Sequence, residues 1–148
     1  MNSKGQEFAG YKMMIGAIIA LFVLIIIVSA VSYFDELRTT ISSNLILDGV
    51  KAAYKSPNGD VIKKTNVTFK EGSYSKRFFG ASIELDEQCI ELKAARISGI
   101  ELSSNESAVI VKANLVNDFY AKCLQGAECK SSCKTCCTFS IGEELERN

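Results

Sequence analysis

The longest apolar stretch of the chain lies near its N-terminus. Met13–Phe34 contains no charged residue, and isoleucine, leucine, valine, phenylalanine and alanine occupy every face of a helix drawn through it. At ~1.5 Å per residue such a helix spans ~33 Å, about the thickness of the hydrocarbon core of a bilayer. A soluble amphipathic helix would instead carry a single apolar stripe. The pattern therefore predicts a transmembrane helix whose first partner is membrane lipid.

A helical pattern continues beyond this stretch. Apolar residues recur at three- and four-residue spacing, which predicts a helical extension. The polar run Ser42-Ser43-Asn44 predicts a break, followed by a second short helix that contains Val50 and Ala53. Helical structure should stop at Ser56–Asp60, which holds the only proline and an Asn-Gly pair. The apolar positions of the extension are Phe34, Leu37, Ile41 and Leu45.

From residue 61 onward apolar and polar residues alternate, as is typical of β-strands. The most regular alternation is Ala108–Cys123, and its length predicts that a bulge or turn at Asn117-Asp118 divides it. The tail Glu143–Asn148 is expected to fray. Further strands are expected at Val61–Phe69, around Ile83 and Leu85, around Ile90 and Leu92, at Ile97–Leu102 and over Cys137–Ile141.

These patterns together predict an α+β protein. A long N-terminal hydrophobic helix, serving as a transmembrane or filament stalk, precedes a small antiparallel β-sheet or β-sandwich that disulfides brace. Lys4 and Lys12 precede the apolar stretch, and Asp35 and Glu36 follow it. The positive-inside tendency therefore places the N-terminus in the cytoplasm and the β-rich part outside a plasma membrane that the chain crosses once.

The composition excludes several classes of function. The chain has no histidine, which removes Ser-His-Asp and Cys-His catalysis and any metal site that uses imidazole. Lysine plus arginine and aspartate plus glutamate number 17 each, without the basic excess typical of a nucleic-acid partner. No glycine pattern suits a phosphate-binding loop. We therefore expect a protein that is not an enzyme and binds no cofactor.

The six cysteines favour disulfides, because an even number in an extracytoplasmic domain is typical of a disulfide framework. Cys123 and Cys137 have the apolar parity of their predicted strands and should point into the core, and Cys89 should pair within the C-terminal cluster. Cys133 and Cys136 have zinc-knuckle or redox spacing, so metal and redox interpretations stay open, although no second C-x-x-C exists. The disulfide candidates are Cys89, Cys123, Cys129, Cys133, Cys136 and Cys137.

Two tripeptides fit the acceptor pattern for N-glycosylation. Asn66 begins Asn-Val-Thr, and Asn105 begins Asn-Glu-Ser within a predicted turn. Both lie in the part of the chain expected outside the membrane. Asn66 and Asn105 are therefore candidate glycosylation sites.

The N-terminus, with Lys4-Gly5-Gln6 ahead of an uninterrupted apolar helix, resembles the class III signal peptide of archaeal type IV pilins and archaellins. The resemblance covers roughly residues 3–34. It implies that a prepilin-type membrane peptidase cuts between Gly5 and Gln6, and that the retained helix assembles with identical subunits or related pilins. The small residues Gly16, Ala17 and Ala20 would allow close packing of such helices.

The resemblance and the hydrophobic pattern together suggest four segments: a leader (1–5), a hydrophobic transmembrane and assembly helix (6–34), a helical extension (35–56) and an extracytoplasmic β-rich domain with the cysteines (57–148). The expected function is that of a pilin-like subunit of a type IV-pilus-like surface filament that displays a β-rich head. The alternative is a monomeric, membrane-anchored extracytoplasmic binding module. Two other fates of the helix stay open, an uncleaved signal anchor and a secretory signal cut after Ala30.

Overall fold

The computed structural model describes residues 4–129 and 132–146. The chain forms two compact units that divide between Arg38 and Thr39. Helix α1 (Lys4–Lys55) contributes to both units: its N-terminal part makes up the described portion of the first, and its last turns belong to the second. We call the second unit, from Thr39 onward, the head. The fold is α+β, as the sequence predicts, with a long apolar N-terminal helix followed by disulfide-linked β-sheets.

The head contains two β-sheets. One has four strands in the order β1-β6-β7-β3, and the other has three in the order β2-β5-β4. All pairings are antiparallel except β3 with β7, which is parallel and departs from the antiparallel sheet predicted. The strands are β1 (Val61–Phe69), β2 (Gly72–Ser75), β3 (Ile90–Ala94), β4 (Ile100–Leu102), β5 (Ala108–Val111), β6 (Leu115–Gln125) and β7 (Thr135–Ile141).

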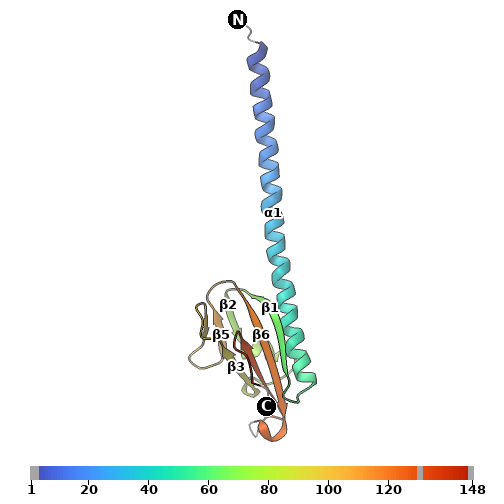
Figure 1. Cartoon of the computed structure of the whole chain (residues 1–148), viewed down its shortest axis with the longest axis vertical. Helices are drawn as coiled ribbons and strands as arrows, with labels where there is room; N and C mark the ends of the chain where they lie inside the picture. The colour runs from blue at the N-terminus through green and yellow to red at the C-terminus, as the bar shows by residue number, and fades with distance from the viewer. Residues whose placement is uncertain (1–3, 130–131, 147–148) are drawn as a thin grey trace. The chain divides into compact units, whose positions relative to one another are not determined.

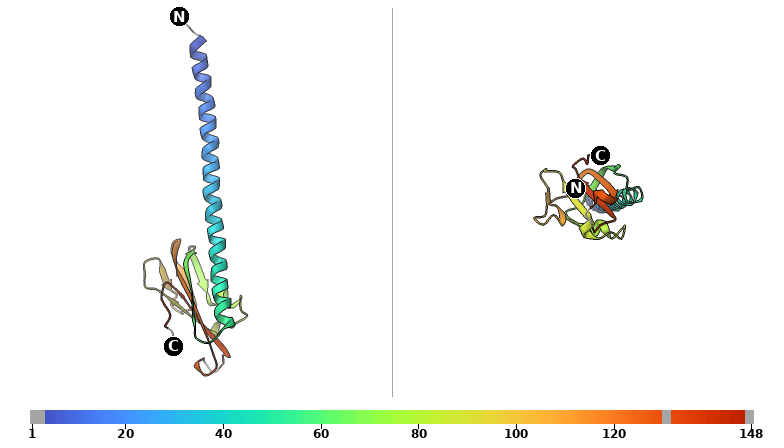
Figure 2. Two further views of the ribbon diagram at one scale, coloured as in Figure 1. Left: turned by 45° about the vertical axis from the view of Figure 1, so that its right-hand side comes forward. Right: turned by 90° about the horizontal axis from the view of Figure 1, so that it is seen from below.

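The last turns of α1 lie alongside β1 and β6, as Figure 1 shows and the turned view in Figure 2 confirms. The contact is close at Gly49, where an added Cβ would lie 3.3 Å from side-chain atoms of Lys64 and Phe119. The buried face of the helix within the head comprises Ser42, Ile46, Gly49, Val50 and Ala53. This face differs from the predicted stripe, because Ile41 is exposed and Leu45 is half-buried.

The predicted break at Ser42-Ser43-Asn44 is wrong, because α1 continues through these residues to Lys55. Ser42 is buried, and its Oγ accepts a hydrogen bond from the Thr68 N–H of β1 at 3.0 Å. A serine side chain can compete for backbone hydrogen bonds and so weaken a helix. Ser42 instead bonds to Thr68 of β1, and the helix continues through it.

The helix ends at the predicted turn. The Asp60 N–H donates to Asn58 Oδ1, and Gly59 adopts a φ of 86°. A Cβ at Gly59 would lie 3.0 Å from Leu124 Cδ2, so both the conformation and the space favour glycine. The Gly59 N–H also donates to the Cys123 carbonyl at 3.0 Å, which connects this turn to β6.

Two short elements differ from the predicted strands. Ile83 and Leu85 do not form a strand, since the N–H groups of both donate to the Gly80 carbonyl in a turn. Just before this turn lies α2 (Lys76–Gly80), which the alternation did not predict. Its N-cap is Ser75, whose Oγ accepts from the Phe78 N–H at 3.2 Å.

The predicted long strand Ala108–Cys123 is divided, but not where expected. β5 ends at Val111 and β6 begins at Leu115, whereas Asn117-Asp118 lies inside β6. The break allows β5 to pair in the three-stranded sheet and β6 in the four-stranded sheet. Asn114, within the break, accepts a hydrogen bond from the Glu71 N–H at 2.9 Å through its Oδ1.

The core of the head centres on stacked aromatic rings. The Phe79 ring of α2 lies 5.9 Å from that of Phe119 and 5.1 Å from that of Phe139, measured between ring centroids. All three side chains are at most 1% exposed. The α2 segment therefore supplies a central core residue even though it spans little more than one turn.

Candidate functional site

The apolar segment (Met13–Phe34) is the largest exposed hydrophobic surface on the described chain. Its large side chains are exposed on all faces of α1, from 39% for Ile15 to 80% for Met13. By length and composition the helix is able to cross a membrane. Contiguous exposed apolar surface of this extent is typical of a membrane or protein interaction site. It is therefore the first candidate functional surface.

The sequence-predicted residues of this helix lie as follows. Gly16, Ala17 and Ala20 are exposed, and an added Cβ at Gly16 would meet no atom within 4 Å. The backbone of Gly5 and Gln6 lies within α1. The small residues thus leave room for a neighbouring helix to approach.

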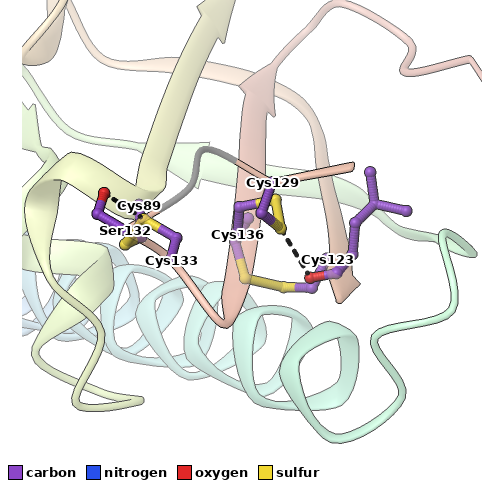
Figure 3. The surroundings of a disulfide bond; sticks show 8 residues. Cys89, Cys123, Cys129, Ser132, Cys133 and Cys136 are labelled. Atoms are coloured by element: carbon purple, nitrogen blue, oxygen red, sulfur yellow. Dashed lines mark hydrogen bonds between the residues drawn. A yellow bond between two sulfur atoms is a disulfide. The ribbon is translucent and has the colours of Figure 1, made fainter. Parts of the chain in front are cut away.

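The six cysteines form three disulfides that converge on the start of β7 (Figure 3). Cys89 pairs with Cys133, so the expectation that Cys89 has a partner in the C-terminal cluster is confirmed. Cys129 pairs with Cys136. The six sulfurs are joined in three pairs, so none of them is a free thiolate that could bind zinc. The structure therefore does not support the metal and redox interpretations of the cysteines.

Cys123 and Cys137 form the third disulfide, which joins directly opposite residues of β6 and β7. Their Cα atoms are 4.1 Å apart. Such a short separation is typical of a non-hydrogen-bonded antiparallel pair. Both residues are at most 2% exposed, which confirms the prediction that they point into the core.

The two glycosylation candidates have different surroundings. Asn105 lies in an exposed turn, and its Oδ1 accepts from Ser107 Oγ at 2.7 Å. Asn66 is also exposed but lies at an irregularity of β1, where it has a φ of 56° and its N–H donates to Asp118 Oδ1. Both side chains are accessible, and Asn105 is outside the strand pairings.

The tail after β7 does not fray within the described residues. Leu145 is only 6% exposed and lies near Val61 and Tyr120. Lys122 Nζ donates to the Glu146 carbonyl at 2.9 Å, and Ser140 Oγ donates to the Glu143 carbonyl at 2.6 Å. The expectation of a frayed tail is wrong over this range, because Leu145, the apolar residue of this acidic segment, is buried beside β1 and β6.

An ion pair connects β1 with β6. Lys63 Nζ lies 2.9 Å from Asp118 Oδ2, and the hydrogen bond to Lys63 holds the pKa of Asp118 below its ordinary value. The same carboxylate raises the pKa of Lys63. Asp118 also accepts a hydrogen bond from the Asn66 N–H. The Asp118 side chain therefore takes part in the ion pair with Lys63 and also bonds the backbone at the irregularity of β1.

We expect this pair to make the stability of the head depend on pH. A carboxyl group whose pKa is lower in the folded state stabilises the fold above its unfolded pKa, about 3.9, and this stabilisation is lost as the pH falls further. Asp118→Asn, which keeps an acceptor for Asn66, should therefore reduce the acid-induced loss of unfolding free energy. Urea unfolding from pH 6 to pH 2.5 measures this. If the dependence of unfolding free energy on pH were the same in Asp118→Asn as in the wild type, the ion pair would not be its source. Glu84→Gln, a change at an exposed glutamate, is the control.

Chemistry that would indicate an active centre is not evident in the described part of the chain. No group of three or more histidine, cysteine, aspartate or glutamate side chains is placed there to hold a metal ion. The features with a clear physical role are the apolar segment and the disulfide-linked head. Comparisons with protein-family models, with curated proteins and with solved structures found no match to this chain.

Proposed function

We propose that this protein is a pilin-like subunit of a type IV-pilus-like surface filament. The observation that carries the proposal is the apolar segment, which is exposed on every face of α1 while the last turns of the same helix pack into the head. A helix that is apolar all round suits lipid before assembly and a bundle of identical helices afterwards. The resemblance of Lys4-Gly5-Gln6 to an archaeal class III signal peptide supports the same proposal.

The proposed course of assembly has two stages. The chain first lies in the plasma membrane with its N-terminus in the cytoplasm and the head outside, and a prepilin-type peptidase cuts between Gly5 and Gln6. The mature subunit then exchanges lipid for the helices of identical or related subunits. The three disulfides support an extracellular location for the head, since such bonds persist in oxidising surroundings.

Mass spectrometry of the N-terminus of the native membrane-associated protein tests the processing step. We expect a mature chain that begins at Gln6. Gly5→Leu should block the cut, whereas Gly10→Leu, the matched change farther along, should leave it intact. A retained Met1 would contradict the proposal and favour a simple anchor. A chain beginning at Val31 would indicate a secreted protein.

Assembly is tested separately by electron microscopy of cell-surface material. Gly16→Leu should reduce filament formation and leave membrane insertion unchanged, because a leucine at this position holds neighbouring helices apart while remaining compatible with lipid. Ile18→Leu, which conserves volume, is the control. Wild-type protein that is found only as a membrane-bound monomer would contradict the proposal and favour the second candidate.

That second candidate is a monomeric, membrane-anchored extracytoplasmic binding module. The observation that favours it is an open groove of about 690 Å³ in the head, bordered by β3 and β4. A groove of this size is sufficient for a peptide or small molecule.

A further inference from the structure

Of the two tripeptides that fit the acceptor pattern for N-glycosylation, the one at Asn105 lies in the turn that joins β4 to β5. The Glu106 N–H donates to the Ser103 carbonyl at 2.8 Å, and the Ser103 N–H donates to the Ala108 carbonyl at 2.9 Å. Asn105 occupies the third position of the resulting β-turn and is exposed. We call residues 103–107 the acceptor turn. It lies outside the strand pairings of the head.

Three hydrogen bonds converge on the side-chain oxygen of Asn105. The hydroxyls of Ser103 and Ser107 donate to Asn105 Oδ1 at 2.9 and 2.7 Å, and the Ser107 N–H donates to it at 3.3 Å. No hydrogen bond to Asn105 Nδ2 occurs in the described part of the chain. The oxygen is therefore occupied by donors from the turn, and the amide nitrogen keeps both of its hydrogens for an external partner.

This arrangement suits transfer of a sugar to the amide nitrogen. The nitrogen of an amide is a weak nucleophile, because resonance draws its lone pair into the carbonyl group. Donors at Oδ1 stabilise the negative charge that the oxygen takes up when the nitrogen loses a proton. The acceptor pattern requires a hydroxyl two residues after the asparagine, and in the acceptor turn that hydroxyl, on Ser107, is already bonded to Asn105 Oδ1.

The other tripeptide, which begins at Asn66, is held within β1. Val67 is fully buried and pairs with β6. The Asn66 N–H donates to Asp118 Oδ1 of β6 at 3.2 Å, and the Thr68 N–H donates to Ser42 Oγ of α1 at 3.0 Å. To enter the active site of an enzyme, this segment would have to separate from both β6 and α1, whereas the acceptor turn requires no such local unfolding.

We propose that Asn105 is glycosylated on the folded head and that Asn66 is not. The sugar donor is an oligosaccharide joined through phosphate to a polyprenyl lipid, and a membrane transferase acting outside the cytoplasm transfers it. The bond between the anomeric carbon and a phosphate oxygen breaks, a bond from that carbon to Asn105 Nδ2 forms, and the proton lost from Nδ2 accompanies the released lipid phosphate. The inference rests on the extracytoplasmic location of the head proposed above.

Peptide mapping by mass spectrometry of the protein from its native membranes tests the inference, because trypsin separates the two tripeptides. Asn105 lies in the tryptic peptide 97–112, and Asn66 lies in the peptide 65–70. We expect the mass of a glycan on the first peptide, with occupancy of Asn105 at least tenfold that of Asn66. An unmodified Asn105, or a smaller ratio of occupancy, would overturn the proposal.

Variants that keep the acceptor pattern test the geometry of the turn. Ser103→Ala removes one donor to Asn105 Oδ1 and the acceptor for the Ser107 N–H, so occupancy of Asn105 should fall at least threefold. Ser104→Ala changes a neighbouring side chain that makes no hydrogen bond in the described chain, and should leave occupancy unchanged. Three intact disulfides would show that the head has folded in each variant. Equal occupancy in the two folded variants would contradict the role assigned to the acceptor turn.

Labelling of intact cells with a membrane-impermeant amine reagent separates this inference from the proposed location of the head. Lys55 and Lys70 are exposed on the head and should react if it lies outside the membrane. An unmodified Asn105 in a head whose lysines are labelled would overturn the glycosylation alone. An unmodified Asn105 together with unlabelled head lysines would overturn the proposed location as well.

Discussion

Replacing Cys89 and Cys133 together by alanine should lower the free energy of unfolding of the head by about 4 kcal/mol. The disulfide joins residues 44 positions apart, and a closed loop of this length removes more conformational entropy from the unfolded chain than the loops of the other two bonds. It also connects the residue that precedes β3 to the loop that precedes β7, the two strands of the parallel pair. Denaturant unfolding in detergent measures the change.

The other two disulfides provide matched controls for this prediction. Cys129 and Cys136 are separated by only 7 positions, so their replacement by alanine should cost about 2 kcal/mol. Cys123 and Cys137 are 14 positions apart, so replacing both by alanine should lower the free energy of unfolding by about 3 kcal/mol through loop entropy. The loss of two buried sulfurs from the core adds to this destabilisation. If removal of the Cys129–Cys136 bond proved the most damaging of the three, loop length would not determine the order.

Phe119→Ala should destabilise the head by about 3–5 kcal/mol, the usual cost of removing a buried aromatic ring. Phe119 is fully buried, and its ring stacks on Phe79 and lies 6.3 Å from Phe139 between centroids. It also lies against Gly49 of α1. The substitution therefore removes contacts with the helix and with both aromatic partners at once. Denaturant unfolding monitored by near-ultraviolet circular dichroism measures the loss.

The control for Phe119→Ala lies on the same strand. Val116 is 55% exposed, so Val116→Ala should cost less than about 1 kcal/mol. Phe119→Leu, which keeps an apolar side chain, should fall between the two. A similar small loss for Phe119→Ala and Val116→Ala would contradict the central place of this ring in the core.

The alternation of apolar and polar residues predicts strands correctly where one face of the strand is buried. It fails where polar side chains within a strand have specific tertiary partners. β1 and the strand ending at Ile141 agree with the predictions. The predicted position of the break in the long strand is wrong because asparagine and aspartate are disfavoured in strands by composition alone. In the fold, however, Asp118 pairs with Lys63 across the strands, and the polar pair remains within β6.

Neither the groove bordered by β3 and β4 nor the pairing of the cysteines could be predicted from the sequence. Six cysteines allow 15 pairings, and local spacing does not choose among them. Alternation identifies β3 and β4, the strands that border this groove, but not their places at the ends of two different sheets. Which backbone groups remain unpaired depends on which strands pair, a long-range property.

Sequence pattern alone predicts the apolar helix, the end of helical structure before Pro57, most of the strands and the inward parity of Cys123 and Cys137. These features follow from local composition and periodicity, because the burial of one face imposes a regular spacing on the residues that form it. Four features depend on long-range contacts: which face of α1 packs into the head, the entry of Phe79 into the core from α2, the parallel pairing of β3 with β7, and the burial of Leu145. Those outcomes depend on partners distant in the chain, whose contacts outweigh the local preferences of serine, asparagine and acidic residues.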